Sequence, residues 1–509
     1  MTAGDQTDTL AFLTRLLARE GPVERIDTHI SAVLMAGHRV LKLKRAVRFP
    51  FLDFSTPERR LAACEAELAV NRRTAPGLYR GVHRIARGPD AGLVLDGEGP
   101  LVDAVVEMRR FPQDDLFDKM AGDGRLTPAL VADLAHRLAA FHARTPASLG
   151  RGGAAAVADL IALNDRSLRA CGLVPDAEAA ALAAAFRAGL SRHGGRLDAR
   201  GAAGKIRRCH GDLTLRNICL FEGVPTPFDA LEFDEALATT DVLYDLAFVL
   251  MDLWHRGRAD LANLLFNRYL DETDEAADAG LMPFLMAIRA VIRAHVAASA
   301  GQAGEGRAYL ALARSLLADA SATLLAVGGL SGSGKSTLAA AVTPWVGAPP
   351  GARVVSSDRV CKRLHGVPPL TRLPPDAYRP VASEAVYAAL REEAARVLAG
   401  GASAVVDAVF DRQAEREAVA ALAAACGVPF RGVWLHGPVT TLGGRIAARR
   451  NDPSDATLDV LAAQAARDCG TVTWRRLDAR LPTGTLRAAV LAGTGAAGPA
   501  ADPASLPGP

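Results

Sequence analysis

The sequence predicts two domains, the first of the α+β class and the second of the α/β class with a parallel sheet. With 509 residues, the chain is longer than one ordinary domain. Up to about residue 320, β-rich segments are followed by long helical segments rich in Ala and Leu. Beyond that point, short apolar strands alternate with helices, which is typical of a parallel sheet. We therefore expect domains at 1–320 and 321–493, and the composition of residues 494–509 predicts a disordered tail.

The composition argues against several classes of protein. Apolar residues make up 50% of the chain and charged residues 23%, which is a globular composition. A formal net charge of +3 is small for this length and gives no support for a surface that binds nucleic acid or an anionic membrane. The seven cysteines include no CxxC pair, so neither a zinc site nor a disulfide framework is indicated.

We expect a cytoplasmic protein. A reducing compartment fits the scattered cysteines, and the first residues lack the basic start of a signal peptide. No apolar run reaches the roughly 18 residues that span a bilayer. The sequence gives no indication of the oligomeric state.

The first domain is expected to begin with strands and to continue with helices. Residues 25–50 alternate in polarity and are rich in β-formers, which predicts strands. Residues 58–73 carry apolar side chains at helical spacing, and residues 101–111 predict another strand. From residue 127 to about 190 the pattern is helical, and a region of short strands and loops is expected at 205–234.

The stretch "GLSGSGKST" in the second domain predicts a phosphate-binding loop. Gly329, Gly334, Lys335 and Ser336 satisfy the pattern GxxxxGK[ST], with an apolar strand before it and a helix after it. In such a loop, backbone N–H groups face phosphate oxygens, the lysine reaches the β- and γ-phosphates, and the hydroxyl of Ser336 binds Mg²⁺. The predicted nucleotide-binding residues are Gly329, Leu330, Ser331, Gly332, Ser333, Gly334, Lys335, Ser336 and Thr337.

Two aspartates follow strands of the second domain. Asp358 ends "VVSSD" and Asp407 ends "ASAVVD". The carboxyl ends of parallel strands line the ligand crevice, so Asp358 is a candidate base for an attacking hydroxyl and Asp407 a candidate Mg²⁺ ligand. Helix capping is the alternative for both. Arg445 and Arg449 are spaced to share one helix face, where they either close over a phosphoryl group or form a solvated basic face.

These motifs resemble the small P-loop kinase family that includes the kinase domain of polynucleotide kinases. The resemblance covers roughly 321–490 and rests on "GLSGSGKST", "SSDRVCKRL", "VVDAVFD", "RIAARR" and "DPSDA". It implies that Asp358 is a base-like residue, that Asp407 lies near Mg²⁺, and that Arg445 or Arg449 is a lid arginine. Cys361 departs from the pattern, because such proteins often carry a basic residue there.

The stretch "CHGDLTLRNICL" predicts a second phosphotransferase site in the first domain. His210, Asp212 and Asn217 satisfy the pattern HxDxxxxN, in which the carboxylate orients and deprotonates a hydroxyl and the amide helps to bind Mg²⁺. Asp229 follows at a spacing that suits a second Mg²⁺ ligand. Asp234 competes with it, but its distance along the chain fits less well.

This constellation resembles the aminoglycoside phosphotransferase and choline-kinase-like families, which share the protein-kinase-like fold, over roughly 30–300. The resemblance implies that Asp212 is the catalytic base, that Asn217 and Asp229 are Mg²⁺ ligands, and that His210 supports the loop. It also requires a strand lysine paired with a helix carboxylate.

For that pair, Lys42 and Lys44 share one face of a strand, and a helix offers Glu65 and Glu67. We favour Lys42 with Glu67. Solvated strand and helix faces are the alternative. The stretch "HISAVLMAGHRV" lacks the Gly-rich loop of protein kinases, so either a short hairpin near Met35–Gly37 covers the phosphates or their cover is poor.

The whole chain resembles the bacterial fusion family described as bifunctional aminoglycoside phosphotransferase/ATP-binding protein. The resemblance implies an ATP- and Mg²⁺-dependent kinase with two modules that phosphorylate hydroxyl groups of small molecules. Two alternatives stay open. The first domain is a degenerate ligand-binding module that regulates one active P-loop kinase, or the chain is a polynucleotide 5′-hydroxyl kinase, against which the near-neutral charge counts. The sequence does not name an acceptor.

Overall fold

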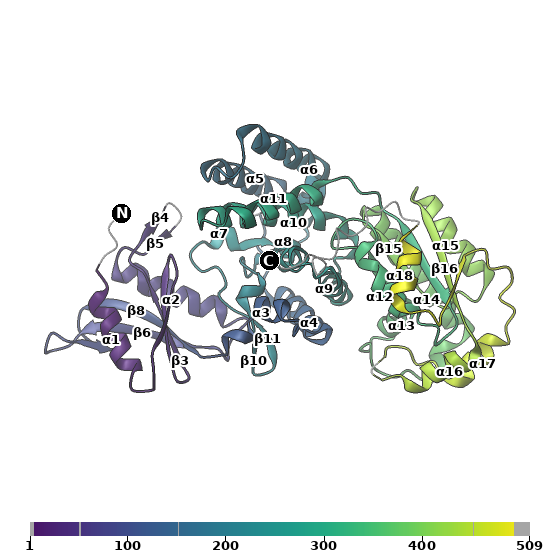
Figure 1. The fold of residues 1–509 in the computed structure, drawn as a ribbon, viewed down its shortest axis with the longest axis horizontal. Helices are drawn as coiled ribbons and strands as arrows, with labels where there is room; N and C mark the ends of the chain where they lie inside the picture. The colour runs from purple at the N-terminus through teal and green to yellow at the C-terminus, as the bar shows by residue number, and fades with distance from the viewer. Residues whose placement is uncertain (1–4, 50–51, 151, 451, 493–509) are drawn as a thin grey trace, which may run out of the picture. The chain divides into compact units, whose positions relative to one another are not determined.

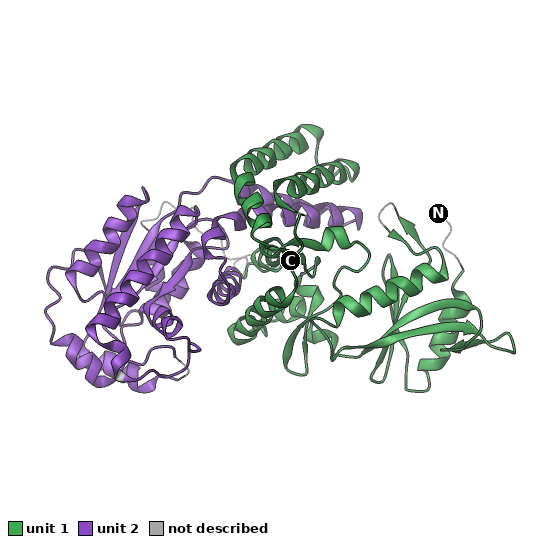
Figure 2. Ribbon diagram, turned by 180° about the vertical axis from the view of Figure 1, so that it is seen from behind, with its two compact units in different colours: residues 1–258 green, residues 259–509 purple. Residues whose placement is uncertain are grey.

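The computed structural model describes residues 5–49, 52–150, 152–450 and 452–492. The chain divides into two compact units, unit 1 (Met1–Arg258) and unit 2 (Ala259–Pro509), which Figure 2 colours green and purple. The predicted disordered tail, 494–509, lies outside the described residues. One stretch, residues 276–299, is long and apolar enough to span a membrane, but 67% of its most apolar window is buried, as in a core helix.

Unit 1 begins with a six-stranded sheet in which every pairing is antiparallel. Its order is β1-β2-β3-β8-β6-β7. The strands are β1 (Glu24–Asp27), β2 (Ser31–Ala36), β3 (Arg39–Lys44), β6 (Tyr79–Arg87), β7 (Leu93–Leu95) and β8 (Leu101–Arg109). The predicted strands at 25–50 and 101–111 are confirmed. Gly37, with φ of 52°, opens the two-residue turn between β2 and β3.

A helix covers each face of this sheet, which Figure 1 shows in purple. On β3, Val40 faces the cluster formed with α2 (Pro57–Asn71), while Leu41 and Leu43 face the cluster formed with α1 (Thr7–Leu17). Because side chains alternate along a strand, Lys42 and Lys44 lie on the α2 side. The predicted helix at 58–73 is therefore confirmed, and it starts after Thr56, whose side chain caps it.

The rest of unit 1 is mostly helical. Its helices are α3 (Phe117–Gly122), α4 (Pro128–Arg144), α5 (Gly153–Ala170), α6 (Asp176–Ala202), α7 (Glu235–Ala238) and α8 (Val242–His255), with 3-10 turns η1 (Gln113–Asp115) and η2 (Leu215–Asn217). Three small two-stranded sheets complete it: β4 (Arg48–Phe49) with β5 (Leu52–Asp53), β9 (Ile206–Arg208) with β12 (Thr239–Asp241), and β10 (Ile218–Phe221) with β11 (Val224–Pro227).

Unit 2 is built on a five-stranded sheet, drawn in green and yellow in Figure 1, in which every pairing is parallel. Its order is β14-β15-β13-β16-β17. The strands are β13 (Leu324–Gly329), β14 (Arg353–Ser356), β15 (Ala404–Asp407), β16 (Phe430–His436) and β17 (Arg475–Asp478). The predicted parallel α/β sheet is confirmed.

Helices cover both faces of this sheet, because alternate residues of its buried strands are apolar on opposite sides. On β13, Leu324 and Ala326 belong to one core cluster, and Leu325 and Val327 to the other. The described helices of unit 2, not all of which lie on the sheet, are α9 (Ala259–Glu272), α10 (Met282–Ser299), α11 (Ala303–Leu317), α12 (Lys335–Val342), α13 (Ser357–Leu364), α14 (Pro380–Ala399), α15 (Gln413–Ala425), α16 (Val439–Ala448), α17 (Leu458–Ala465) and α18 (Thr483–Leu491), with 3-10 turns η3 (Ala276–Leu281), η4 (Thr343–Trp345) and η5 (Pro375–Tyr378).

The compact units and the predicted domains divide the chain at different places. The units meet between residues 258 and 259, whereas the sequence places the boundary near residue 320. Helices α9, α10 and α11 account for the difference. The domain limits 1–320 and 321–493 stay a prediction.

Candidate functional site

Lys42 of β3 lies between two carboxylates in unit 1. Its Nζ is 2.8 Å from Oε1 of Glu67 on α2 and 2.5 Å from Oδ1 of Asp229. Burial alone would lower the pKa of Lys42, but Asp229 and Glu67 outweigh it and raise that pKa well above its usual value. A permanently charged lysine held by a helix carboxylate is the arrangement that phosphate binding needs. Glu65 is exposed and lies outside this arrangement.

Lys44 extends the same arrangement into a chain of alternating charges. Its Nζ lies 2.5 Å from Oε2 of Glu67 and is also ion-paired with Glu232. Burial alone would raise the pKa of Glu67, yet Lys42 and Lys44 lower it. Sequence reasoning missed Glu232. The only signal in the sequence was that Lys42 and Lys44 lie on the same face of a strand. Two neighbouring lysines imply a second carboxylate beside Glu67.

The loop between β9 and β10 holds the HxDxxxxN residues close together. Nδ2 of Asn217 donates to Oδ2 of Asp212 at 2.8 Å and to its backbone oxygen at 2.9 Å. Nε2 of His210 lies 3.0 Å from the backbone oxygen of Phe228, and burial lowers the pKa of this histidine. The buried imidazole therefore supports the segment that leads to Asp229.

Two buried aspartates of α8 hold this loop. Asp245 accepts hydrogen bonds from the backbone N–H groups of His210 at 3.2 Å and Gly211 at 2.8 Å, and Asp252 accepts from the N–H of Leu215 at 2.9 Å. His142, Cys209 and Asp245 also form a cluster that could hold a metal ion. Both carboxylate oxygens of Asp245 already accept hydrogen bonds from the loop backbone. These bonds explain why Asp245 lies in this cluster, so a metal ion is not needed to explain it.

Asp229 and Asp234 differ in their surroundings. Asp229 has a φ of 59°, which is uncommon for a residue with a side chain and is frequent at functional sites. Its side chain remains 41% exposed, so a ligand can reach it. Asp234 caps α7 by accepting the N–H of Leu237 at 2.9 Å. The geometry thus leaves Asp229 partly exposed beside Lys42 and engages Asp234 in the helix.

A cavity of about 360 Å³ connects these residues. Its lining includes the apolar residues Val33, Val40, Met108 and Phe228 as well as polar ones. The polar lining includes Lys42, Asp212, Asn217 and Asp229. Met35, next to the β2–β3 turn, also lines it. A cavity lined in this way fits the apolar nucleobase and the charged phosphates of a nucleotide.

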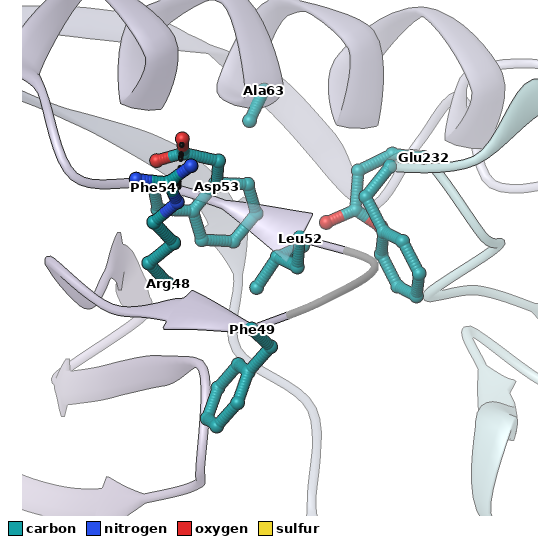
Figure 3. Close-up of a pocket in the computed structure, with 8 residues that line it drawn as sticks. Arg48, Phe49, Leu52, Asp53, Phe54, Ala63 and Glu232 are labelled. Atoms are coloured by element: carbon teal, nitrogen blue, oxygen red, sulfur yellow. Dashed lines mark ion pairs between the residues drawn. The ribbon is translucent and has the colours of Figure 1, made fainter. Parts of the chain in front are cut away.

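Glu232 forms a wall common to two cavities. It lines the first cavity, and it also lines a second one of about 530 Å³ beside the β4–β5 hairpin, with Phe49, Leu52 and Phe54 (Figure 3). Arg48 and Asp53 of the hairpin are ion-paired there, with Nε and Oδ2 3.5 Å apart. The segment after Asp229 therefore separates the two spaces.

The P-loop of unit 2 runs from the end of β13 to the start of α12. Gly332 has a φ of 81°, and a Cβ there would lie 2.3 Å from the backbone oxygen of Leu442. Only glycine fits this position. The hydroxyl of Ser333 is buried and has no hydrogen-bond partner among the described residues. A buried donor aimed into a loop of this kind suits a phosphate oxygen.

Lys335, Asp358 and Asp407 lie together beside the P-loop, where Asp407 is buried and the other two are half-buried. Burial lowers the pKa of Lys335 and outweighs the effect of Asp407 and Asp358. Burial likewise raises the pKa of Asp358 and of Asp407 above the usual range, although Lys335 opposes it. Asp407 is hydrogen-bonded to the hydroxyl of Ser336, the predicted Mg²⁺ ligand. A bound cation would stabilise both carboxylates in their charged form.

Asp358 differs from its predicted location in one detail. The strand β14 ends at Ser356, and Asp358 lies in the first turn of α13 rather than at the strand end. The N-cap of that helix, Ser356, makes no side-chain capping bond. Ser454 donates a side-chain hydrogen bond to Asp358 instead.

Arg445 lies in the last turn of α16, and Arg449 is the C-cap residue that follows Ala448, the last residue of the helix. Arg445 donates to the backbone oxygens of Ala479 at 2.8 Å and Ser333 at 3.4 Å. In the described part of the chain, Nη1 of Arg449 is buried without a hydrogen-bond partner. Its charge acts on both Asp358 and Lys335, so the side chain lies near the site.

The residues around Cys361 tie α13 to the segments that follow it. Cys361 is buried and packs in the core, and Lys362 is ion-paired with Asp455. Asp455 also accepts the N–H of Leu373 at 2.9 Å and the hydroxyl of Tyr378 at 2.6 Å. Sequence reasoning missed Asp455, because its partners are far away in the chain.

Comparisons with known proteins identify a family in unit 2 and relatives along most of the chain. The family described as "AAA domain" matches residues 324–468. The uncharacterized proteins Rv2004c of Mycobacterium tuberculosis and Mb2027c of Mycobacterium bovis are each 32% identical to this chain over 487 residues, which is 90% of this chain and 92% of either relative.

Several solved kinases are similar in structure. A choline/ethanolamine kinase family protein from Mesorhizobium loti is 16% identical and covers 62% of this chain and 96% of its own, with a TM-score of 0.38. An aminoglycoside phosphotransferase is 12% identical and covers 62% and 98%, with a TM-score of 0.40. A gluconokinase from Sinorhizobium meliloti is 23% identical and covers 34% and 90%, with a TM-score of 0.24.

The match to Rv2004c extends over nine-tenths of both chains. The geometry of unit 1 is that of a kinase-like fold with the HxDxxxxN loop, and unit 2 holds a P-loop on a parallel sheet. The chain therefore belongs to the family of Rv2004c, and its unit 2 carries a P-loop domain that matches the "AAA domain" family.

Proposed function

We propose that the chain is a kinase with two phosphotransfer modules, each of which moves the γ-phosphoryl group of ATP to a hydroxyl group of a small molecule. One observation carries the proposal. Each unit brings a candidate base, a phosphate-binding lysine and a candidate Mg²⁺ carboxylate together around one site. They are Asp212, Lys42 and Asp229 in unit 1, and Asp358, Lys335 and Asp407 in unit 2.

ATP and Mg²⁺ fit the residues of unit 1. The cavity offers apolar side chains to the nucleobase of ATP. The partly exposed carboxylate of Asp229 and the amide oxygen of Asn217 would hold Mg²⁺. When bound, Mg²⁺ neutralises charge on the phosphates. Lys42, held by Glu67, binds phosphate oxygens. Asp212 orients the acceptor hydroxyl and takes up its proton, while His210 keeps the loop in place.

ATP and Mg²⁺ also fit unit 2. The unpartnered hydroxyl of Ser333 and the unpartnered Nη1 of Arg449 are donors that a phosphate would satisfy. Ser336 and Asp407 would hold Mg²⁺, and Lys335 binds the β- and γ-phosphates. Asp358 accepts the proton of the attacking hydroxyl, and Arg445 and Arg449 stabilise the transferred group.

We further propose that the protein works in the cytoplasm on a small-molecule acceptor, without a membrane or a nucleic acid as partner. All seven cysteines are free thiols, as expected in a reducing compartment. The small net charge supports a small acceptor rather than a nucleic acid.

A second candidate function is a single active P-loop kinase that a ligand-binding unit 1 regulates. The observation that favours it is the direct ion pair between Lys42 and Asp229, because these residues must separate to bind phosphate and Mg²⁺. The absence of a Gly-rich loop from the sequence between residues 29 and 40 favours it too.

Turnover of ATP over a panel of acceptors tests the proposal. The panel contains sugars, amino sugars, aminoglycosides, nucleosides and 5′-hydroxyl oligonucleotides, and the proteins are the wild type, Asp212→Ala and Lys335→Ala. Two active modules require that each substitution abolishes phosphorylation of a different acceptor. If only Lys335→Ala matters, unit 1 has no phosphotransferase activity and the second candidate function is correct.

A further inference from the structure

Helix α9 carries three polar residues on one face, of which Asn263 and Asn267 are buried and Asp271 is half-buried. Asn263, Asn267 and Asp271 recur every four residues and are therefore neighbours along the helix. Nδ2 of Asn263 donates to the backbone oxygen of Pro350 at 2.9 Å. The polar face of α9 is thus directed at the segment that enters β14, the edge strand of the sheet.

Asn267 pairs with β14 as a neighbouring strand would. Its Nδ2 donates to the backbone oxygen of Ala352 at 3.1 Å, and its Oδ1 accepts the N–H of Val354 at 2.7 Å. The N–H of Arg353, between them, points the other way and donates to Ser403 at 2.9 Å, next to β15. One side-chain amide therefore satisfies a donor and an acceptor on the open edge of the sheet, where unpaired backbone groups are costly.

Asp271 binds two arginines of the same region. Its Oδ1 is 2.7 Å from Nη1 of Arg353 on β14, and its Oδ2 is 3.0 Å from Nη1 of Arg359 on α13. Arg353 is fixed further by Glu393 of α14, at 2.8 Å. These are charge-assisted hydrogen bonds in a buried setting, so the geometry of the arginines is tightly held.

The contacts of α9 lie on both sides of Asp358 in the chain. Asn267 and Asp271 hold β14, which ends at Ser356, two residues before Asp358. Asp271 also holds Arg359, the residue directly after it. A base must lie within hydrogen-bond reach of the proton it takes up, so the position of this short segment determines whether Asp358 can act.

We propose that Asn267 and Asp271 are positioning residues for Asp358, so that α9 is part of the P-loop phosphotransfer site although it precedes the P-loop in sequence. This inference rests on the proposed function, in which Asp358 is the base of that site. A displacement of about 1 Å in a catalytic group costs on the order of 100-fold in rate.

The test uses the full chain with Lys42→Met, so that only the P-loop site binds nucleotide and turns over. Asn267→Ala and Asp271→Asn are compared with Asn164→Ala, which alters another buried asparagine, in α5 of unit 1. Turnover of MgATP is measured with the acceptor that Lys335→Ala abolishes, and with water where the panel yields none. Binding of a fluorescent ATP analogue counts the folded sites.

We expect kcat per nucleotide-binding site to fall about 10- to 100-fold in both α9 variants, with the dissociation constant of the analogue changed less than about twofold. The Asn164→Ala protein keeps its kcat. Asn267→Asp keeps the acceptor for Val354 and loses the donor to Ala352, so its kcat lies between those of the wild type and Asn267→Ala.

Two results would overturn the inference, and they differ in what else they overturn. If the α9 variants lose binding sites while kcat per site is unchanged, their role is only structural and the proposed function stands. If Asp358→Asn retains full kcat, Asp358 is not the base, and both the inference and that part of the proposed function fail.

Discussion

The buried lysines of β3 show what a single residue contributes to the site of unit 1. Asp229, Lys42, Glu67, Lys44 and Glu232 alternate in charge, and each lysine contacts two carboxylates. An isolated buried charge costs several kcal/mol, so each member depends on its neighbours. The two lysines nevertheless have different surroundings, because Lys42 lines the cavity and Lys44 is fully buried.

Replacing Lys42 and Lys44 by methionine, one at a time, distinguishes a role in nucleotide binding from a role in the stability of unit 1. Lys44→Met leaves Glu67 and Glu232 short of a cation, and we expect unit 1 to lose about 3–5 kcal/mol of its free energy of unfolding. Lys42→Met chiefly abolishes nucleotide binding in unit 1. Hydrogen exchange in β3 and α2 measures the first effect and analogue binding the second. Equal exchange rates in the two variants would contradict this assignment.

The raised pKa of Asp358 predicts the pH dependence of the P-loop module. Burial raises that pKa above 3.8, so the carboxyl group stays protonated to a higher pH than a free aspartate. A base must be ionised. We therefore expect kcat/KM of this module to fall with decreasing pH through a pKa above 3.8, as a pH–rate profile in the Asp212→Ala protein measures.

Two neighbours of Asp358 should move this profile in opposite directions. Ser454 stabilises the charged form by a hydrogen bond, whereas Asp452 repels it. Ser454→Ala is therefore expected to shift the acid limb to higher pH and Asp452→Asn to lower pH. Shifts of the same sign in both variants would show that a different group titrates.

At the scale of an element, the sequence predicted what is local and missed what is distant. The strand, loop and helix of the P-loop are contiguous, so Gly329 to Thr337 could be placed from the pattern alone. The end of α16 could not, because nothing in the residues around Arg449 stops a helix. Glu232 and Asp455 could not be found either, since their partners Lys44 and Lys362 are about 190 and 90 residues away, respectively.

Two glycines of the P-loop provide a matched test of its shape. Both Gly332 and Gly334 have positive φ, so alanine costs about 1–2 kcal/mol at either position. At Gly332 the added Cβ would also meet the backbone of α16 at 2.3 Å, whereas at Gly334 the nearest atom is a side-chain nitrogen of Arg445 at 3.6 Å. We expect Gly332→Ala to abolish MgATP binding to unit 2.

For Gly334→Ala we expect a loss of affinity of about 5- to 30-fold, which corresponds to the backbone cost alone. Calorimetry with MgATP in a Lys42→Met chain measures the P-loop site by itself. Similar affinities for the two alanine variants would mean that the loop and α16 move apart at no cost.

For the whole molecule, the hardest feature to predict was the place at which the chain divides. Helical periodicity shows that 259–317 is helical, but it does not show which elements those helices contact. For α9, the contacts of Asn267 answer this question. Its side-chain amide is hydrogen-bonded to the backbone of Ala352 and Val354 in the P-loop unit. Such a contact joins a side chain to backbone some 85 residues away, and no local pattern reveals it.

The number of nucleotides that one chain binds tests whether both units are functional. Each unit has its own lysine and its own candidate Mg²⁺ ligands, so we expect two MgATP molecules per wild-type chain in equilibrium dialysis. Lys42→Met and Lys335→Ala should each leave one, and the double variant none. If Lys335→Ala alone removes all binding, the ion pair between Lys42 and Asp229 does not open for ATP. Unit 1 would then be a regulatory module, and the two-site mechanism would be excluded.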